Sequence, residues 1–282
     1  MKYLIILFVS IICIGVGVKF VSSNYKTKLL IDNEKKIKYY FWGMVLSICG
    51  VASFFGYLLF LALRPNQPSS LFGNLLAFSK AVQEEINLSH YLFPLFVVCI
   101  ISFAIFQYCF KHYKILKTGL QGEKMTQNIL KTLPNSYQII SNITIEFEGK
   151  RSEIDNLILS PRGIVIIETK NYKGILEGSV DDIDWKYTKT SAQGNNYTTT
   201  VKNPLKQVKR QTYILSQILK ENNINCWIDG YLFLHNAKSY IDSDSILLNE
   251  TSLTHKITSS GKDNALRVED IQRIKEILKI NN

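Results

Sequence analysis

Two acidic residues and a lysine lie on neighbouring predicted strands and could carry metal-dependent chemistry. Asp155 falls within a strand predicted over 153–159, and Glu168 follows the β-branched run Ile164–Ile167, which predicts a buried strand. Lys170 comes two residues after Glu168, so both side chains leave the same face of the strand. A carboxylate and an ammonium beside a buried strand must be paired, bound to a metal ion or placed at the sheet's edge. The pattern fits a solvated salt bridge at a strand end as well as it fits a catalytic site.

The surrounding elements predict a mixed α/β domain. A helical period runs from Gly119 to Leu133, and apolar alternation or β-branched runs predict the strands that follow. Asn203 and Pro204 begin a second helix, with Asn203 as its cap. The further elements are strands at Tyr137–Phe147, Ile175–Glu177, Trp185–Thr188 and Cys226–Leu234, a polar loop at Ser191–Thr200, and a C-terminal helix at 268–280.

Several of these segments together resemble the nuclease-related (NERD) domain. The motifs, in the order of that family, are Gly122-Glu123, Glu153-Ile-Asp155, Gly163-Ile-Val-Ile-Ile-Glu168-Thr-Lys170-Asn-Tyr-Lys-Gly174, Trp185 and Asn203-Pro204-Leu-Lys-Gln207. The resemblance covers about residues 118–240. The family is similar in turn to the restriction-endonuclease-like PD-(D/E)xK nucleases. The resemblance therefore implies an α/β fold in which a mixed sheet is flanked by helices.

The same resemblance implies a metal-dependent nuclease site. Asp155 and Glu168 would be Mg²⁺ ligands, with Glu123 completing the metal's shell; Mn²⁺ is an alternative ion. Lys170 would hold or help to deprotonate the attacking water, or stabilise charge on the phosphorus centre. Carboxylate oxygens suit Mg²⁺, and phosphodiester cleavage needs a cation that neutralises the phosphate and activates water. Gln207 matches a glutamine found in related nucleases, although a solvent-facing helix glutamine is the alternative.

Basic residues surround this constellation in the sequence and could bind nucleic acid as a polyanionic substrate. An ordinary solvated surface is the alternative, and Trp185 is expected in the core rather than as a base-stacking platform. His235 and His255 lack the spacing of metal ligands, so no role is assigned to them. The basic residues are Lys173, Lys186, Lys189, Lys202, Lys206, Lys209 and Arg210.

The first part of the chain has the composition of a membrane anchor. Residues 1–110 contain nine of the 33 basic and four of the 23 acidic residues, so each part contributes +5 to the net charge of +10. Three apolar segments, at about residues 3–21, 40–63 and 91–110, predict transmembrane helices in contact with the lipid bilayer. The domains expected are therefore a membrane anchor at 1–112 and a nuclease-related domain at 113–282. The first segment is the shortest, and a cleaved signal peptide is its alternative interpretation.

Loop charges predict the orientation in the cell membrane. Six lysines lie between the end of the uncharged run Tyr3–Val18 and the second apolar segment, whereas only Arg64 and Lys80 lie between the second and third segments. Because basic residues stay on the cytoplasmic side, the N-terminus is expected outside and the C-terminal domain in the cytoplasm. Cys226 is the one cysteine beyond residue 110, which agrees with a reducing compartment.

The sequence thus predicts a membrane-tethered, Mg²⁺-dependent nuclease. Two other classes of function stand beside it. One is a catalytically silent module that binds nucleic acid or serves as a scaffold. The other is a membrane sensor or assembly partner, which the absence of charged residues inside the apolar segments disfavours.

Overall fold

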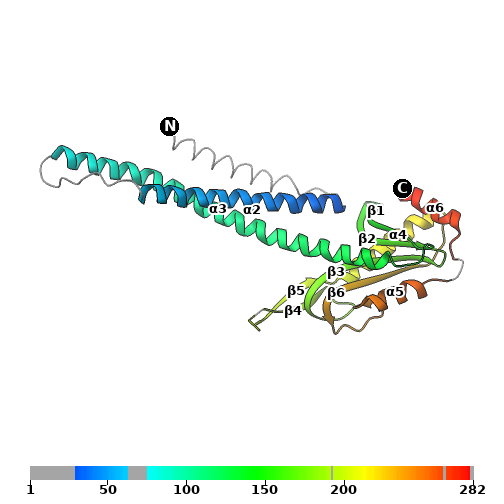
Figure 1. Ribbon diagram of the computed structural model, residues 1–282. Helices are drawn as coiled ribbons and strands as arrows, with labels where there is room; N and C mark the ends of the chain where they lie inside the picture. Colours follow the sequence, from blue (N-terminus) through cyan, green and yellow to red (C-terminus); the bar gives the residue numbers. More distant parts are fainter. Residues whose placement is uncertain (1–28, 63–74, 192, 263–264, 280–282) are drawn as a thin grey trace. The chain divides into compact units, whose positions relative to one another are not determined.

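The computed structural model describes residues 29–62, 75–191, 193–262 and 265–279. The chain divides into two compact units, Met1–Lys117 and Thr118–Asn282. The described part of the first unit is helical, and the second unit is a mixed α/β domain (Figure 1). The predicted α/β class is confirmed for this second unit.

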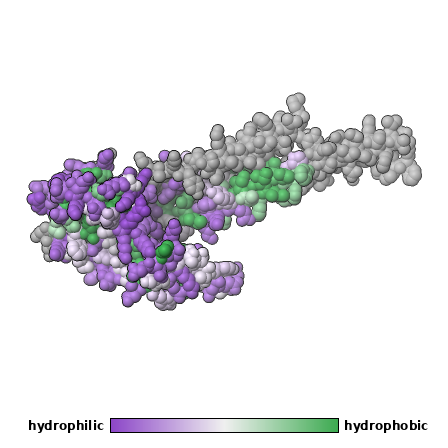
Figure 2. All heavy atoms as spheres, turned by 180° about the vertical axis from the view of Figure 1, so that it is seen from behind, coloured by the Kyte–Doolittle hydropathy of each residue, from purple (hydrophilic) through white to green (hydrophobic). Residues whose placement is uncertain are grey.

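The described part of the first unit contains helix α2 (Leu29–Ala62) and most of helix α3 (Leu75–Leu130). Each has a segment long and apolar enough to cross a membrane, Asn33–Gly56 and Phe96–Leu130, and few residues of these segments are buried. Figure 2 shows a hydrophobic region on these helices and a mainly hydrophilic face on the second unit. Two candidate membrane helices are therefore found where three were predicted, and the first predicted segment, at about 3–21, lies outside the described residues.

Helix α3 is continuous, which corrects one sequence-based boundary. The sequence predicted a separate helix starting near Gly119, but the structure joins it to the apolar segment 91–110 in one helix with Pro94 inside it. Glycine costs only about 1 kcal/mol in a helix interior, so Gly119 and Gly122 do not end this helix.

The second unit is built on a seven-stranded mixed sheet, in which β1 to β5 follow one another in sequence order. The pairs β1–β2, β2–β3, β3–β4 and β4–β5 are antiparallel. Strand β6 lies parallel to β3 on its other edge, and β7 lies parallel to β6. The strands are β1 (Gln138–Phe147), β2 (Lys150–Ser160), β3 (Gly163–Glu177), β4 (Asp184–Thr190), β5 (Asn196–Lys202), β6 (Ile228–Ser239) and β7 (Ile246–Leu247). The predicted mixed sheet flanked by helices is confirmed.

Helices cover both faces of this sheet. On one face, α4 (Pro204–Glu221) and α6 (Val268–Ile277) pack on Leu157, Leu159, Ile164 and Ile166. On the other, the end of α3 and α5 (Glu250–Ser259) pack on Ile158, Val165 and Ile167. Alternate residues of β3 therefore point to different helices, as the period of a strand requires.

The structure adds elements that the sequence patterns did not predict. Half of the predicted loop Ser191–Thr200 belongs to β5, a polar and mainly exposed strand whose one partner among the described strands is β4. Strand β7 and helix α5 also lie where no element was predicted. The predicted cap of α4 is confirmed, because the Asn203 side chain accepts a hydrogen bond from the Leu205 N–H at 2.9 Å.

Candidate active site

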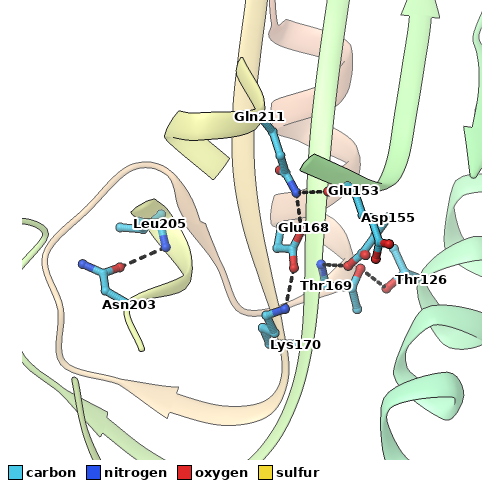
Figure 3. Close-up of polar contacts among 9 residues, drawn as sticks. All are labelled: Thr126, Glu153, Asp155, Glu168, Thr169, Lys170, Asn203, Leu205 and Gln211. Atoms are coloured by element: carbon cyan, nitrogen blue, oxygen red, sulfur yellow. Dashed lines mark hydrogen bonds and ion pairs between the residues drawn. The ribbon is translucent and has the colours of Figure 1, made fainter. Parts of the chain in front are cut away.

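Strand β3 and helix α4 place Glu168 in the centre of a buried polar cluster. The Glu168 side chain is fully buried. Its Oε1 accepts a hydrogen bond from the Lys170 Nζ at 2.5 Å, and its Oε2 accepts one from the Gln211 Nε2 at 2.7 Å (Figure 3). Each oxygen of this buried carboxylate therefore has a hydrogen-bond donor.

Asp155 joins this cluster from strand β2. Its Oδ2 accepts a hydrogen bond from the Thr169 backbone N–H at 2.8 Å, which fixes it beside the residue that follows Glu168. Burial and the charge of Glu168 raise the pKa of Asp155 to about 7, while Lys170 and the Thr169 hydrogen bond act in the opposite direction. The cluster therefore holds more negative charge than Lys170 alone offsets.

Two carboxylates act on the pKa of Lys170. Burial lowers the pKa of the Lys170 ammonium, but the charges of Glu168 and Asp155 raise it more, so that its pKa lies above the ordinary value. The side chain is 29% exposed, whereas that of Glu168 is 1% exposed. The ammonium thus stays charged and reaches solvent from a buried carboxylate.

Glu123 approaches the cluster from helix α3. Burial raises the pKa of Glu123, as do the charges of Glu168 and Glu153, and Lys170 lowers it. Its Oε2 is buried and has no hydrogen-bond partner among the described residues. Gly122 lets the helix come this close, because a Cβ there would lie 2.7 Å from the Cβ of Asn171. Glu123 therefore brings a carboxylate oxygen to the cluster that no protein donor satisfies.

Gln211, rather than the predicted Gln207, contacts the cluster from helix α4. Gln211 is fully buried, and its Nε2 donates to the Glu153 backbone oxygen at 2.6 Å as well as to Glu168. Gln207 lies one turn earlier, half-buried, and takes no part in these hydrogen bonds. Helical period could have indicated this, because residue 211 falls on the same face as Leu205, Val208 and Leu215.

A series of side-chain hydrogen bonds, which the sequence analysis missed, links strand β3, helix α3 and strand β6 next to the site. The Thr169 hydroxyl donates to the Thr126 Oγ1 at 3.1 Å, and Thr126 Oγ1 lies 2.8 Å from the His235 Nε2. Burial lowers the pKa of His235, which favours its neutral form. These hydrogen bonds tie α3 and β6 to the residue that holds Asp155. His235 therefore has a structural role where the sequence had indicated none.

The cluster suits a hard divalent cation held by few protein ligands. Among the described residues, no three His, Cys, Asp or Glu side chains are grouped closely enough to enclose a metal ion. Mg²⁺, however, commonly binds one or two carboxylates and keeps water or substrate phosphates in its other positions. Glu123 has an oxygen without a hydrogen-bond partner, and burial and the charge of Glu168 disfavour the ionised form of Asp155, so a cation would stabilise both as carboxylates. The donor set therefore fits Mg²⁺ in this mode.

The remaining predicted residues lie outside the cluster. Trp185 is fully buried and its Nε1 donates to the Ser179 backbone oxygen at 2.8 Å, so its expected place in the core is confirmed. Lys186 is paired with Glu177 at 2.9 Å. Most of the predicted basic residues are exposed: Lys173, Lys189, Lys202, Lys206, Lys209 and Arg210.

Comparisons with known proteins match parts of this chain. An uncharacterized protein of Bacillus anthracis is 36% identical over 69 residues, which are 24% of this chain and 32% of that protein. The chain thus spans about a third of the length of this curated relative. No solved structure matches the chain. The family model described as the nuclease-related domain matches residues 118–235, so this segment is a nuclease-related domain, a member of the restriction-endonuclease-like superfamily.

Proposed function

We propose that the protein is a membrane-tethered, Mg²⁺-dependent nuclease that hydrolyses phosphodiester bonds at the cytoplasmic face. The observation that carries the proposal is the clustering of Asp155 from strand β2 with Glu168 and Lys170 of strand β3. A carboxylate of perturbed pKa beside a lysine is typical of sites that perform acid–base or metal chemistry. The match to the nuclease-related domain favours nuclease chemistry for this cluster.

The residues of the site have separate tasks in this proposal. Asp155 and Glu168 would hold the metal, and the Glu123 carboxylate would act on it through its charge. When bound, Mg²⁺ would neutralise charge on the scissile phosphate and lower the pKa of a water molecule. Lys170 orients the attacking water or stabilises the negative charge that develops at the phosphate. Gln211 fixes the direction of the Glu168 carboxylate through its 2.7 Å hydrogen bond.

Membrane tethering rests on the two apolar helical segments and on the loop charges. Asn33–Gly56 and Phe96–Leu130 have the required length and composition. Lysines cluster before and at the start of the first of these segments and after the apolar part of the second, which favours a cytoplasmic location for the C-terminal unit.

A catalytically silent module is the second candidate, and one observation favours it. Both oxygens of Glu168 already have protein partners, Lys170 and Gln211, so the ion pair can stand without a metal. Such a site would hold nucleic acid on its basic surface without cutting it.

Cleavage assays with the full chain in detergent separate the two candidates. Labelled single- and double-stranded DNA and RNA are incubated with the protein in Mg²⁺ or in chelator. The nuclease proposal expects cleavage of at least one substrate in Mg²⁺ and none in chelator, and a loss of at least 100-fold in Asp155→Ala. Glu221→Ala, which removes an exposed carboxylate from the last turn of α4, is the matched control and should cut as the parent does. If the parent binds these substrates but cuts none, the nuclease proposal is wrong and the silent module replaces it.

A further inference from the structure

One edge of strand β3 is open at the site. Strand β6 pairs with β3 from Ile164 to Leu176 and so occupies the other edge over this length. On the site's edge, β2 pairs with β3 at residues 163–167 and β4 pairs with it at 175–177. Residues 168–174 lie between these two ladders, and the Thr169 N–H in this interval is satisfied by the Asp155 side chain. The catalytic cluster thus lies in a gap between two antiparallel hairpins.

The β1–β2 hairpin and helix α4 form the first border of this gap. The Lys150 Nζ lies 5.5 Å from the centre of the Tyr213 ring, and Tyr213 is 50% exposed. The Arg210 Nη2 donates to the Arg151 backbone oxygen at 3.0 Å. Gln211, between Arg210 and Tyr213 in α4, contacts Glu168 itself. This border therefore places a cation and an accessible aromatic ring beside the site.

The β4–β5 hairpin forms the second border, and it projects beyond the sheet (Figure 1). The Lys189 Nζ lies 4.9 Å from the centre of the Tyr187 ring. Tyr197 pairs with Lys189 across the hairpin and is 61% exposed. The Tyr187 hydroxyl accepts a hydrogen bond from the Lys173 N–H at 2.9 Å, which attaches this border to the end of the gap. The second border thus also has a lysine over a tyrosine ring and an exposed tyrosine.

Ring contacts connect the second border to the cluster. Tyr172 and Tyr187 have ring centres 5.1 Å apart. The charges of Lys170 and Glu168 both act on the pKa of Tyr172, although burial is the main cause that raises it. Tyr172, two residues after Lys170, therefore contacts the hairpin that carries the exposed Tyr197.

We propose that these two borders, Lys150–Tyr213 and Lys189–Tyr197, form a binding track for single-stranded nucleic acid that crosses the catalytic gap. The inference deepens the proposed function and rests on it for the class of ligand. Aromatic rings bind nucleic acid by stacking on bases, and lysines beside them hold the phosphates. Bases are free to stack on protein side chains only where they are not stacked within a duplex. Exposed tyrosines on both sides of the gap thus favour a single strand over a duplex.

The charges on the two borders are mixed. Lys150, Arg151 and Arg210 are exposed on the first border, and the carboxylates of the same β-hairpin are Glu146, Glu148 and Glu153. On the second border, Lys186 is paired with Glu177, and Lys173 and Lys189 are exposed. The track therefore depends on the two lysines that lie over tyrosine rings, Lys150 and Lys189, rather than on an excess of positive charge.

Binding measurements in chelator test the track without requiring cleavage. Fluorescence anisotropy with the full chain in detergent compares labelled 20-nucleotide single-stranded DNA and RNA with blunt duplexes of the same sequence. The parent should bind a single strand at least tenfold more tightly than the duplex. Tyr213→Ala and Tyr197→Ala should each raise the Kd for the single strand about tenfold, since the stacking of one base contributes roughly 1–3 kcal/mol. Tyr197→Phe, which keeps the ring, should bind as the parent does.

Two matched controls lie away from the gap. Tyr240→Ala removes a tyrosine that is 71% exposed, just beyond the end of β6 on the other edge of β3. Lys220→Gln removes a cation in the last turn of α4, whereas Lys150→Gln removes one from the first border. The controls should leave Kd within twofold, and Lys150→Gln should raise it and reduce its dependence on salt.

The outcomes distinguish the track from the nuclease proposal. Unchanged single-strand binding in both tyrosine variants, or tighter binding of the duplex, overturns the track even if the parent cuts nucleic acid in Mg²⁺. Tyrosine-dependent binding of a single strand supports the track even if no cleavage is found, in which case the nuclease proposal alone is wrong.

Discussion

Gln211 and Lys170 hold the Glu168 carboxylate from two sides, with Nε2 2.7 Å from one oxygen and Nζ 2.5 Å from the other. One partner comes from helix α4 and the other from the strand of Glu168 itself (Figure 3). The direction of this carboxylate therefore depends on how α4 packs on the sheet. The consequence is that a residue outside the recognised motifs helps to determine the geometry of the site.

Gln211→Ala should lower both stability and activity. It leaves a buried Glu168 oxygen and the Glu153 carbonyl without their donor, which costs about 1–3 kcal/mol. Cleavage should fall at least tenfold because the carboxylate is no longer fixed. Gln207→Ala, one turn earlier and outside these hydrogen bonds, is the matched control and should change stability by less than about 0.5 kcal/mol. Thermal melts and cleavage rates of the full chain check both, and equal effects of the two variants would contradict the assignment.

Lys170→Ala should destabilise the second unit. Glu168 is fully buried, and removing one partner of a buried ion pair costs roughly 3–5 kcal/mol. We expect the lower end of this range, because the Lys170 side chain is 29% exposed and water can enter. The double variant Glu168→Gln with Lys170→Met should recover much of this stability, although it should remain inactive. A double variant that is less stable than Lys170→Ala would show that the ion pair is not the cause.

Without metal, stability should fall as the pH rises, and Asp155 is the cause. Its pKa of about 7 in the folded protein lies above the ordinary value of 3.8, so the folded state binds the proton more tightly. The stabilising effect of this proton is complete below pH 4 and is lost as the pH rises through 7. Melts at pH 5.5, 7 and 8.5 in chelator should show this decline, and Mg²⁺ should reduce it by binding the ionised carboxylate. Asp155→Asn should flatten the profile in chelator; an unchanged profile would assign the effect to another group.

Gly174 should be intolerant of a side chain. Its φ is +148°, and a Cβ there would lie 2.2 Å from the Thr188 backbone oxygen, so alanine would push β4 away from β3. We expect a loss of at least about 2 kcal/mol, more than for backbone strain alone. Gly194→Ala is the matched control, since it has a φ of +83° but no atom within 4 Å of its Cβ. Unfolding measurements that give equal losses for the two variants would show that the contact with β4 is unimportant.

The sequence predicted the centre of the domain well, and for physical reasons. The run Ile164–Ile167 is buried on both faces, so its composition alone indicated a central strand, and the Asn203-Pro204 pair indicated the start of α4. Strand β5 was missed because its residues are polar and exposed, and its pairing with β4 leaves no apolar alternation to detect.

The site was predicted only in part, because spacing along the chain does not reveal partners in space. Glu168 and Lys170 are close in sequence, and strand geometry predicted that their side chains leave the same face, with a salt bridge as one of the possible outcomes. Gln211 is 43 residues from Glu168, and Thr126 is 109 residues from His235. These contacts depend on how helices pack on the sheet, which no local pattern encodes.

Cysteine labelling in intact cells should place residue 75 outside and residue 200 inside. The prediction follows from the lysines, which precede the apolar segment of α2 and follow that of α3, whereas the connection between them has little basic charge. Leu75→Cys and Thr200→Cys are made separately in a chain whose native cysteines are replaced, and each is exposed to a reagent that does not cross membranes. Leu75→Cys should react in intact cells, and Thr200→Cys only after the cells are opened. A permeant reagent serves as the control and should label both variants. Reaction of Thr200→Cys in intact cells would place the second unit outside, where a nuclease could act only on extracellular nucleic acid.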